Sequence, residues 1–311
     1  MNGALLIVDR QNHRIRRVGS DGVIQAFIGS GVEGDGTSGF GPTVDLNSPT
    51  AVTIAPDGSY YVANHYNWRV KRFDGVSLNC SVVAGNGSPG FVGDGGLATE
   101  ARLNLPSSVV FDDAGDWYVL DQGNSRIRRV DRVTGIITAL IGGLRGFADG
   151  SCDSALFALP GVHIGLSDKS TMEAAPGNDR IYICDTENHR IRVLDLATCF
   201  VSTIAGVGEP GWEGDGGPAL SAKLNYPTDL AIAANGDMYI ADTHNHAIRK
   251  IDASGVITTV AGIGVRGTSP SGIKATDAML YEPGGVAFDD ATNTLYIADT
   301  YNHQVRKVIN P

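Results

Sequence analysis

The chain has 311 residues, a formal net charge of −10 at pH 7 and 41 glycines. The acidic balance argues against nucleic acid as a partner, because phosphate contacts need a positive field. No apolar run is long enough to span a bilayer as a helix. Frequent glycine with only 19% charged residues favours short strands and tight turns over an array of helices.

One hairpin pattern recurs six times along the chain. An apolar strand ends in Asp, two variable residues and an Asn follow, and a second strand carries Ile or Val beside a basic residue. The anchor position of this pattern is occupied by Asp9, Asn64, Asp121, Asp185, Asp242 and Asp299. These anchors recur about every 57 residues, and such a period identifies a repeat array.

Each complete repeat reads as four strands, lettered a to d. In the fifth repeat we expect strand a at Asp229–Ala233, b at Met238–Ala241, c at Ala247–Ile251 and d at Val256–Ala261. The Asn-Gly turn between strands a and b is typical of hairpins, in which turn residues adopt positive φ. Four-stranded antiparallel sheets repeated radially form a β-propeller. The sequence therefore predicts an all-β, six-bladed β-propeller that covers residues 1–311 as one domain.

The first and last blades are predicted to be incomplete. Strand a is expected five times, in each case after a proline: Pro49, Pro106, Pro160, Pro227 and Pro283. Strand d is also expected five times, so the first blade lacks strand a and the last lacks strand d. We expect residues before Met1 in the natural protein to complete the blades. The alternative is five closed blades, with Val23–Ile28 completing the last one.

A loop of about twenty residues follows strand d, far longer than a usual hairpin loop. Most copies carry Gly-Asp-Gly, a helical turn and then a Leu shortly before the proline, as at Leu103 and Leu224. We expect this Leu to fill the space between two blades. The Gly-Asp-Gly segments lack the closely spaced oxygen ligands of a calcium loop. Asp35 and Asp215 are therefore expected to accept backbone hydrogen bonds in tight turns.

Strand direction places the Asp-x-x-Asn connections and the long d–a loops on one face. Ligand sites collect on loops that a rigid scaffold carries, so we expect binding on this face. The candidate binding residues are the anchors Asp9, Asn64, Asp121, Asp185, Asp242 and Asp299 and the aromatic residues Trp68, Trp212, Tyr226, Tyr281 and Tyr301. Repetition in all blades favours a structural role for the anchors, each capping its turn or pairing with an Arg of its hairpin. The repeated histidines are interpreted in the same way.

Two residues depart from the repeat in strand a. His163 is expected in strand a of the fourth blade, and Asp229 opens strand a of the fifth, where the counterparts are small. An imidazole and a carboxylate can bind a metal or transfer protons. They define an alternative function, a metal-assisted lyase or hydrolase with Ca or Zn in the central channel. One His and one Asp are not a full ligand set, so ordinary polar contacts are preferred, and the first interpretation has no cofactor.

The four cysteines have no metal-ligand spacing. They are Cys80, Cys152, Cys184 and Cys199. Cys184 and Cys199 are expected on strands separated by a third, which is too far for a disulfide, so free thiols are predicted. The segment Ser167–Asp179 is interpreted as an enlarged turn between strands a and b of the fourth blade, and it carries no assigned chemistry.

The repeated hairpin resembles the NHL repeat. The resemblance rests on the D-x-x-N-x-x-[IV]-[RK] pattern, on Asn-His pairs such as Asn12-His13, and on Leu-Tyr-x-Ala-Asp at Leu295–Asp299. It implies a six-bladed propeller but no single activity, because this fold carries binding platforms, RNA-binding domains, lyases and hydrolases. We expect a non-enzymatic module that binds a protein, peptide or glycan as a monomeric part of a larger protein. An extracellular or periplasmic location is favoured over the cytoplasm.

Overall fold

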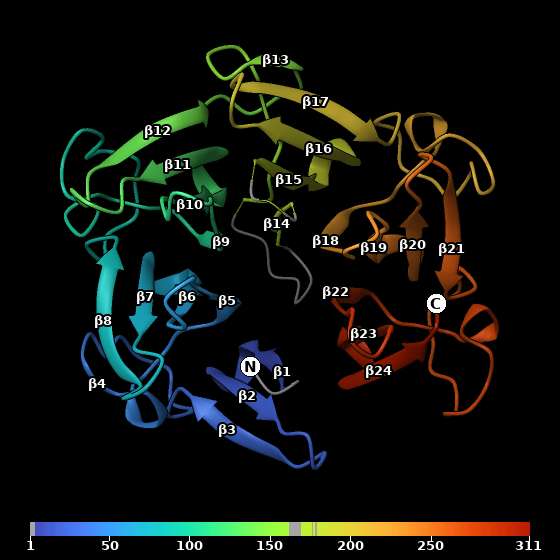
Figure 1. Ribbon diagram of the computed structural model, residues 1–311, viewed down its shortest axis with the longest axis horizontal. Coiled ribbons are helices and arrows are strands. Elements are labelled where there is room, and N and C mark those ends of the chain that lie inside the picture. Colours follow the sequence, from blue (N-terminus) through green and yellow to red (C-terminus); the bar gives the residue numbers. More distant parts are fainter. Residues whose placement is uncertain (1–3, 162–168, 176, 178) are drawn as a thin grey trace. The chain divides into compact units, whose positions relative to one another are not determined.

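The structure is a computed structural model that describes residues 4–161, 169–175, 177 and 179–311. It contains two compact units, Met1–Leu144 and Arg145–Pro311, and each unit holds three antiparallel sheets (Figure 1). The described residues form strands and short 3-10 helices but no α-helix. None of the described helices has the length and hydropathy that a membrane crossing requires. The sheets confirm the prediction of a six-bladed β-propeller.

The first unit holds blades one to three. Blade one has the order β1 (Leu5–Asp9), β2 (Arg14–Val18) and β3 (Ile24–Ile28). Blade two has the order β4 (Gly39–Phe40), β8 (Asn79–Ala84), β7 (Arg69–Phe73), β6 (Tyr60–Asn64) and β5 (Pro49–Ile54). Blade three consists of β9 (Pro106–Phe111), β10 (Trp117–Asp121), β11 (Arg126–Val130) and β12 (Ile137–Gly142).

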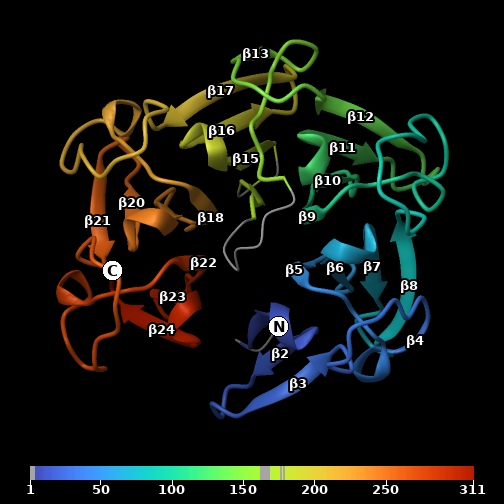
Figure 2. The ribbon, with the colours of Figure 1, turned by 180° about the vertical axis from the view of Figure 1, so that it is seen from behind.

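The second unit holds blades four to six (Figure 2). Blade four has the order β13 (Gly150–Ser151), β17 (Phe200–Ala205), β16 (Arg190–Asp195), β15 (Arg180–Asp185) and β14 (Met172–Ala174). Blade five consists of β18 (Pro227–Ile232), β19 (Met238–Asp242), β20 (Ala247–Ile251) and β21 (Ile257–Ala261). Blade six consists of β22 (Pro283–Asp289), β23 (Thr294–Asp299) and β24 (Gln304–Ile309). Among the described residues, blade one therefore lacks strand a and blade six lacks strand d, as predicted.

Nine 3-10 helices connect the strands in the described chain. Those between strands b and c are η1 (Arg10–Asn12), η3 (His65–Asn67), η4 (Gln122–Asn124), η5 (Thr186–Asn188), η7 (Thr243–Asn245) and η9 (Thr300–Asn302). Those in the d–a loops are η2 (Gly41–Thr43), η6 (Ala219–Ser221) and η8 (Ala275–Asp277). The helical turn predicted in the d–a loops is a single 3-10 turn in these three loops, whereas Gly93–Leu103 has only hydrogen-bonded turns.

The cores lie between neighbouring blades, which explains the nearly continuous apolar strands. Every residue of β9 and β10 is buried, and the face that carries Val109, Phe111, Trp117 and Val119 packs against blade two. Leu103 and Leu224 have no exposed surface and belong to the clusters between blades two and three and between blades four and five. Their predicted position between blades is confirmed. Each buried Leu contributes about 1.5–3 kcal/mol to folding.

The d–a loops also cover open sheet edges. The short strands β4 and β13 pair with the outermost strands β8 and β17 of the blades that follow them. Isolated bridges repeat this contact in blades three and five, at Leu97–Ile136 and Pro218–Val256. Covering the outer edge in this way removes a row of unpaired backbone groups that could pair with another chain.

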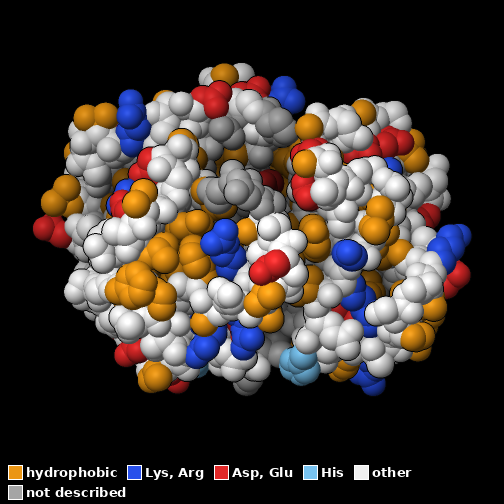
Figure 3. Space-filling model, turned by 60° about the horizontal axis from the view of Figure 1, so that its bottom comes forward, with side chains coloured by type: hydrophobic (Ala, Val, Ile, Leu, Met, Phe, Trp, Pro, Cys, Tyr) orange, Lys and Arg blue, Asp and Glu red, His pale blue; other side chains and the backbone are white. Residues whose placement is uncertain are grey.

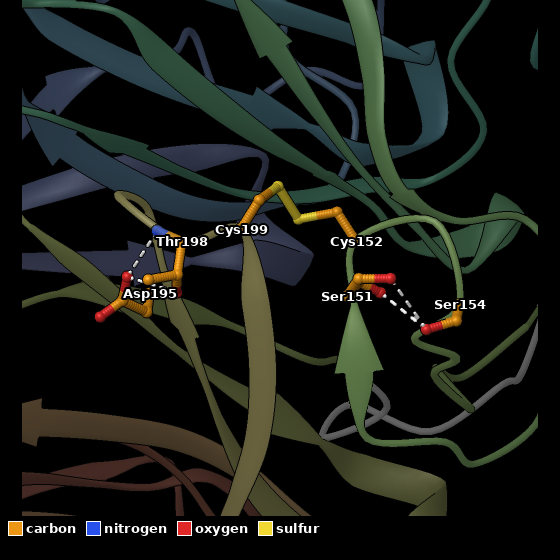
Figure 4. The surroundings of a disulfide bond; sticks show 6 residues. All are labelled: Ser151, Cys152, Ser154, Asp195, Thr198 and Cys199. Atoms are coloured by element: carbon orange, nitrogen blue, oxygen red, sulfur yellow. Dashed lines mark hydrogen bonds between the residues drawn. A yellow bond between two sulfur atoms is a disulfide. The ribbon is translucent and has the colours of Figure 1, made fainter.

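The prediction of free thiols is wrong for one pair, because Cys152 and Cys199 form a disulfide (Figure 4). Their Cα atoms are 5.4 Å apart although 47 residues separate them in sequence. Cys152 follows β13 and Cys199 precedes β17, so the bond links the loop strand to the edge that it covers. The four-strand repeat does not predict this fifth strand. Cys80 and Cys184 are buried free thiols.

Blade four also corrects two further predictions. Met172–Ala174 is strand β14 and pairs with β15, so Ser167–Asp179 is not a turn between strands a and b. Ser170 contacts Thr186 at 2.6 Å between hydroxyl oxygens, as Thr228 contacts Thr243 in blade five. The described strand a of blade four therefore starts at Met172. The predicted position of His163 lies outside the described residues.

Candidate functional site

Each Asp-x-x-Asn connection is a 3-10 turn that is fixed by its own Asp and Asn. In blade five the turn η7 ends at His246, which has a left-handed φ of 53°. The Asn245 side-chain amide donates to the Asp242 carboxylate at 2.8 Å and to the carbonyl of Gly211 in the preceding d–a loop at 2.5 Å. The equivalent asparagines of blades two to four and six also donate to a glycine carbonyl in the preceding loop. Turns and d–a loops therefore lie side by side.

A buried arginine joins two carboxylates beneath this turn. Arg249 has no exposed side-chain surface, and its guanidinium contacts Asp242 of its own hairpin at 3.2 Å and Asp215 of the preceding loop at 2.6 Å. Arg128 pairs in the same way with Asp121 and Asp94, and Arg192 pairs with Asp185 and Asp149. The aspartates of the Gly-Asp-Gly segments therefore pair with the buried arginine of the hairpin that follows, in addition to any backbone N–H that they accept.

This arrangement gives the anchor residues a structural task. Asn64, Asp121, Asp185, Asp242 and Asp299 have no exposed surface, whereas Asp9 is partly exposed. Burial raises the pKa of Asp242 to about 6, while the hydrogen bonds from Asn225 and Asn245 and the charge of Arg249 act against the rise. The carboxylate is thus held mainly ionised at neutral pH. A partner could reach these carboxylates only by displacing their internal donors.

Blades two and six depart from the arginine arrangement at matched positions. In blade two, Asn64 and Lys71 stand where other blades have Asp and Arg, and Lys71 contacts the Asp35 carboxylate at 3.1 Å. The Asn64 side-chain nitrogen is buried and has no hydrogen-bond partner among the described residues. In blade six the loop lacks its Asp, and Arg306 donates to the carbonyl of Ser269 at 2.9 Å. Strand c therefore carries a basic residue in both blades, whereas the loop group that this residue contacts differs.

The repeated histidines cross-link neighbouring blades. The Nδ1 atoms of His13, His189 and His246 accept the backbone N–H of the residue before the next blade's first proline, at 3.1–3.3 Å. Burial lowers the pKa of His189 and of His246, which favours the neutral ring, and the backbone N–H that donates to Nδ1 selects the tautomer with its proton on Nε2. Among the residues that the structure describes, no group of three or more His, Cys, Asp or Glu side chains could hold a metal ion. The geometry supports the structural interpretation of these histidines.

Aromatic and imidazole rings form a row on the turns of the second unit. The aromatic row consists of Tyr226, His244, Tyr281 and Tyr301. Tyr226 stacks on His244 with ring centroids 4.4 Å apart, and Tyr281 stacks on Tyr301 at 5.0 Å. The three tyrosines are half-buried and His244 is exposed. His244 and Tyr301 occupy the second variable position of the Asp-x-x-Asn pattern. Blade two carries Tyr66 at this position, but its ring meets His65 edge-on at 5.0 Å, whereas the rings of blades five and six stack.

The two predicted tryptophans have other surroundings. Trp68 ends the η3 turn at a φ of 53°, at the position that carries His in four other blades. Trp212 lies over the guanidinium of Arg249, 5.6 Å from the carbon of that group to the ring centroid. Its ring also approaches Gly264, whose counterpart Gly208 in the preceding loop is approached by Arg190 instead. Trp212 therefore occupies space that an arginine occupies elsewhere, because strand c of blade five begins with Ala247.

Asp229, in blade five, is fixed by residues from blades four and six. Its carboxylate accepts hydrogen bonds from the Thr171 hydroxyl at 2.7 Å and from the backbone N–H of Val286 at 3.0 Å. The Lys169 ammonium lies 3.8 Å away. Crowding by protein atoms raises the pKa of Glu173 to about 8, and the charge of the Asp229 carboxylate adds to the rise. Solvent nevertheless reaches the Glu173 side chain. Lys169, Thr171, Glu173 and Asp229 form an inner cluster of acid, base and hydroxyl groups.

Comparison with known proteins identifies the repeat. A family model described as Teneurin NHL domain matches residues 162–271, and one described as NHL repeat matches residues 280–308. NHL repeat-containing protein 2 of Homo sapiens is 27% identical over 330 residues, covering 97% of this chain and 44% of that protein. The chain belongs to the NHL-repeat family.

Other relatives are much longer than this chain. Protein SUPPRESSOR OF QUENCHING 1, chloroplastic, of Arabidopsis thaliana is 31% identical over 287 residues, which cover 87% of this NHL propeller and 26% of that protein. Teneurin-4 of Homo sapiens is 31% identical over 264 residues, which cover 73% of this chain and 9% of that protein. This NHL propeller therefore spans less than half the length of these curated relatives.

Solved structures share the fold at low identity. A protein of unknown function from Bacteroides thetaiotaomicron matches with a TM-score of 0.68 and 16% identity, over 99% of this chain and 67% of that one. A virginiamycin B lyase from Staphylococcus aureus matches with a TM-score of 0.51 and 14% identity, over 99% of this chain and 81% of that one. At such identities the likeness shows the fold alone.

The structure adds two site residues that sequence reasoning on this NHL propeller missed. His244 is only a variable residue of the repeat pattern, although its place next to Asn245 puts it on the turn beside Tyr226. Glu173 falls in the predicted enlarged turn, because the fourth strand a is expected directly after Pro160. The hydroxyl residue Ser170 is the available signal, since Thr50, Ser107 and Thr228 occupy the equivalent position of blades two, three and five.

Proposed function

We propose that this NHL propeller is a non-enzymatic recognition module, and that the aromatic row binds a protein partner through an exposed peptide segment. The observation that carries the proposal is the pair of ring stacks on the turn face, Tyr226 with His244 and Tyr281 with Tyr301. Aromatic side chains are enriched at the centres of protein interfaces, because they supply large contact areas at low entropic cost. Repeated turns that are fixed from beneath give these rings a rigid support.

Local chemistry supports a partner with both apolar and polar groups. The Tyr226 hydroxyl donates to the Glu187 carboxylate at 3.2 Å, so a polar rim adjoins the first ring stack. Arg145 is paired with the same glutamate. Figure 3 shows hydrophobic side chains interspersed with acidic and basic ones on the surface it presents. Charged and hydroxyl groups beside the ring stack suit a peptide segment, and the net charge of −10 opposes nucleic acid.

The disulfide supports placement of the module in an oxidising compartment. Cys152 and Cys199 join a loop strand to the outer edge of blade four. Disulfides persist outside the cell or in the periplasm and are rare in the cytosol. We therefore propose an extracellular or periplasmic location and action as one part of a longer protein.

The proposal is tested by ligand selection, which does not require an identified partner. A library of displayed random peptides is panned against the protein, and hydrogen exchange with and without a selected peptide maps the site. We expect protection in the turns η7 and η9, which carry His244 and Tyr301. Selected peptides that protect other regions, or a protein that retains only glycans in a parallel glycan array, would refute the peptide-binding function.

A second candidate function rests on the inner cluster. Asp229 accepts hydrogen bonds from the Thr171 hydroxyl and the Val286 N–H, and its carboxylate contributes to the raised pKa of Glu173. A carboxyl group with a raised pKa can act as an acid near neutral pH beside a second carboxyl group. This supports, as an alternative, a lyase or hydrolase near Asp229, with or without Ca or Zn. Metal content after dialysis tests the metal-assisted form, which requires near-stoichiometric metal that is lost in Asp229→Ala.

A further inference from the structure

Two imidazoles beside the aromatic row each have one ring nitrogen open to a ligand. Nδ1 of His189 accepts the Tyr226 N–H at 3.1 Å, and Nδ1 of His246 accepts the Glu282 N–H at 3.3 Å. A neutral imidazole that accepts at Nδ1 carries its proton on Nε2. Within the described chain no acceptor is bonded to either Nε2, and neither nitrogen is one of the buried atoms that lack a partner. Each Nε2–H is therefore a donor that solvent reaches.

The two donors alternate with the two ring stacks. The His189 ring is tilted against Tyr226, with centroids 6.3 Å apart, and the His246 ring meets Tyr281 edge-on at 6.0 Å. Both histidines end their turns, η5 and η7, at a φ of 53°, so the backbone fixes them in the same way. The turns of blades four to six thus offer one N–H donor beside each pair of stacked rings.

Charged groups beside the row come in opposite pairs. Glu187 is paired with Arg145. Burial is the main cause of the lowered pKa of His246, Glu282 opposes that shift and Arg266 adds to it, so a carboxylate and a guanidinium both act on this ring. Together these four charged groups carry no net charge. The row therefore favours a ligand that is recognised by rings and N–H donors over one that is recognised by its charge.

We propose that the segment bound by the aromatic row is proline-rich and binds as a polyproline II helix. This inference rests on the proposed function, because it specifies the peptide bound at that row. Proline has no N–H, so a proline-rich segment presents apolar rings and carbonyl acceptors. Its prolines pack on the stacked tyrosines, and two of its carbonyls accept from Nε2 of His189 and of His246. Binding a preformed helix costs little conformational entropy.

The polar groups of the row disfavour an ordinary peptide segment. Such a segment brings an N–H at every residue, and each N–H that is buried without an acceptor costs free energy. The Glu187 carboxylate beside the first stack already accepts from the Tyr226 hydroxyl and is paired with Arg145. A segment that lacks N–H groups avoids this mismatch.

The first test uses a displayed library of random peptides panned against the whole chain. We expect the peptides that slow hydrogen exchange in η7 and η9 to be enriched in proline relative to the unselected library. The tightest of them is then remade in two forms. One form has alanine for each proline, which restores the N–H groups, and the other alternates D- and L-proline, which breaks the helix. Each form should bind about tenfold more weakly or worse.

The donors are tested on the protein side. His246→Phe keeps a ring but removes the Nε2–H, and it should weaken binding about tenfold. His246→Gln keeps an amide donor and should bind within about threefold of the wild-type protein. His13→Phe is the matched control, because His13 accepts the Ser48 N–H in the same way and does not belong to the aromatic row. It should leave the affinity unchanged, and hydrogen exchange of each free variant checks that η7 stays folded.

Three results would overturn this inference and leave the proposed function standing. The first is protection of η7 and η9 by selected peptides that are not enriched in proline. The second is equal affinity of the form with alternating D- and L-proline and its parent peptide. The third is equal affinity of His246→Phe and the wild-type protein. Selected peptides that protect neither turn would instead refute the proposed function, and this inference with it.

Discussion

Replacing Asp242 with Asn should destabilise blade five more than any other single amide substitution in its hairpin. Asp242 and Arg249 both have no exposed side-chain surface and contact each other at 3.2 Å. Asn keeps the shape but removes the charge, which leaves Arg249 with one carboxylate instead of two. Removing one partner of a buried ion pair costs about 3–5 kcal/mol. Because Asp215 remains 2.6 Å from Arg249, we expect the lower end, about 3 kcal/mol.

Two matched variants calibrate this effect. Asp215→Asn removes the other carboxylate, whose side chain is 40% exposed, and it should cost about 1–2 kcal/mol, because solvent partly replaces the lost contact. Asp277→Asn makes the same chemical change at an exposed carboxylate with no described partner, so its effect should stay within about 0.5 kcal/mol.

The assay combines urea unfolding with native-state hydrogen exchange. Exchange of the β19 and β20 amides reports on blade five directly, which matters because a chain with two compact units need not unfold in one step. We expect the order Asp242→Asn, then Asp215→Asn, then Asp277→Asn. If Asp242→Asn were no worse than Asp277→Asn, the claim that the buried carboxylate holds Arg249 would be refuted.

Three further changes have defined expectations. Asn64→Asp restores a carboxylate beside Lys71 and should raise stability by about 1 kcal/mol in urea unfolding; a loss would show that Lys71 needs only Asp35. Cys152→Ser should lower stability by about 2–4 kcal/mol and loosen β13 in hydrogen exchange, whereas Cys80→Ser should not affect β13. Burial lowers the pKa of His65 from 6.5 to about 3, so the unfolded chain takes up the proton more readily. The contribution of neutral His65 to the free energy of unfolding is therefore complete above pH 6.5. It should decline as the pH falls toward 3, by at most about 1.4 kcal/mol per pH unit. His65→Asn can still donate to the carbonyl of Pro106, which His65 contacts at 3.1 Å, and should flatten that slope; an unchanged slope would assign it to other groups.

The repeat pattern was sufficient to predict the blades, because each strand is specified by residues close to it in the sequence. The b and c strands follow from alternating turn signals, and β20 begins and ends at the predicted residues Ala247 and Ile251. The buried Leu before each proline and the incomplete terminal blades also follow from counting repeats. These features depend on residues within one repeat, so a single sequence contains the required information.

Contacts between distant segments could not be predicted in the same way. The Cys152–Cys199 disulfide depends on a loop that returns to the far edge of the next blade. The pairing of Asp215 with Arg249 joins residues 34 positions apart, and the repeat supplies many acidic and basic residues with equivalent spacing. In blade four the proline signal failed, because Pro160 precedes extra residues and β14 starts only at Met172. The same proline signal therefore precedes strand a at different distances in different blades.

The most direct test of the proposed function is the affinity of a selected peptide for Tyr281→Ala/Tyr301→Ala. This double variant removes one ring stack of the aromatic row and leaves the anchors Asp242 and Asp299 intact. Gln11→Ala, at the same turn position in blade one, is the control. We predict a loss of about thirtyfold or more for the double variant, as expected for an interface centre worth about 2 kcal/mol, and no change for Gln11→Ala. Equal affinity of the double variant and the wild-type protein would contradict the recognition surface assigned to the aromatic row.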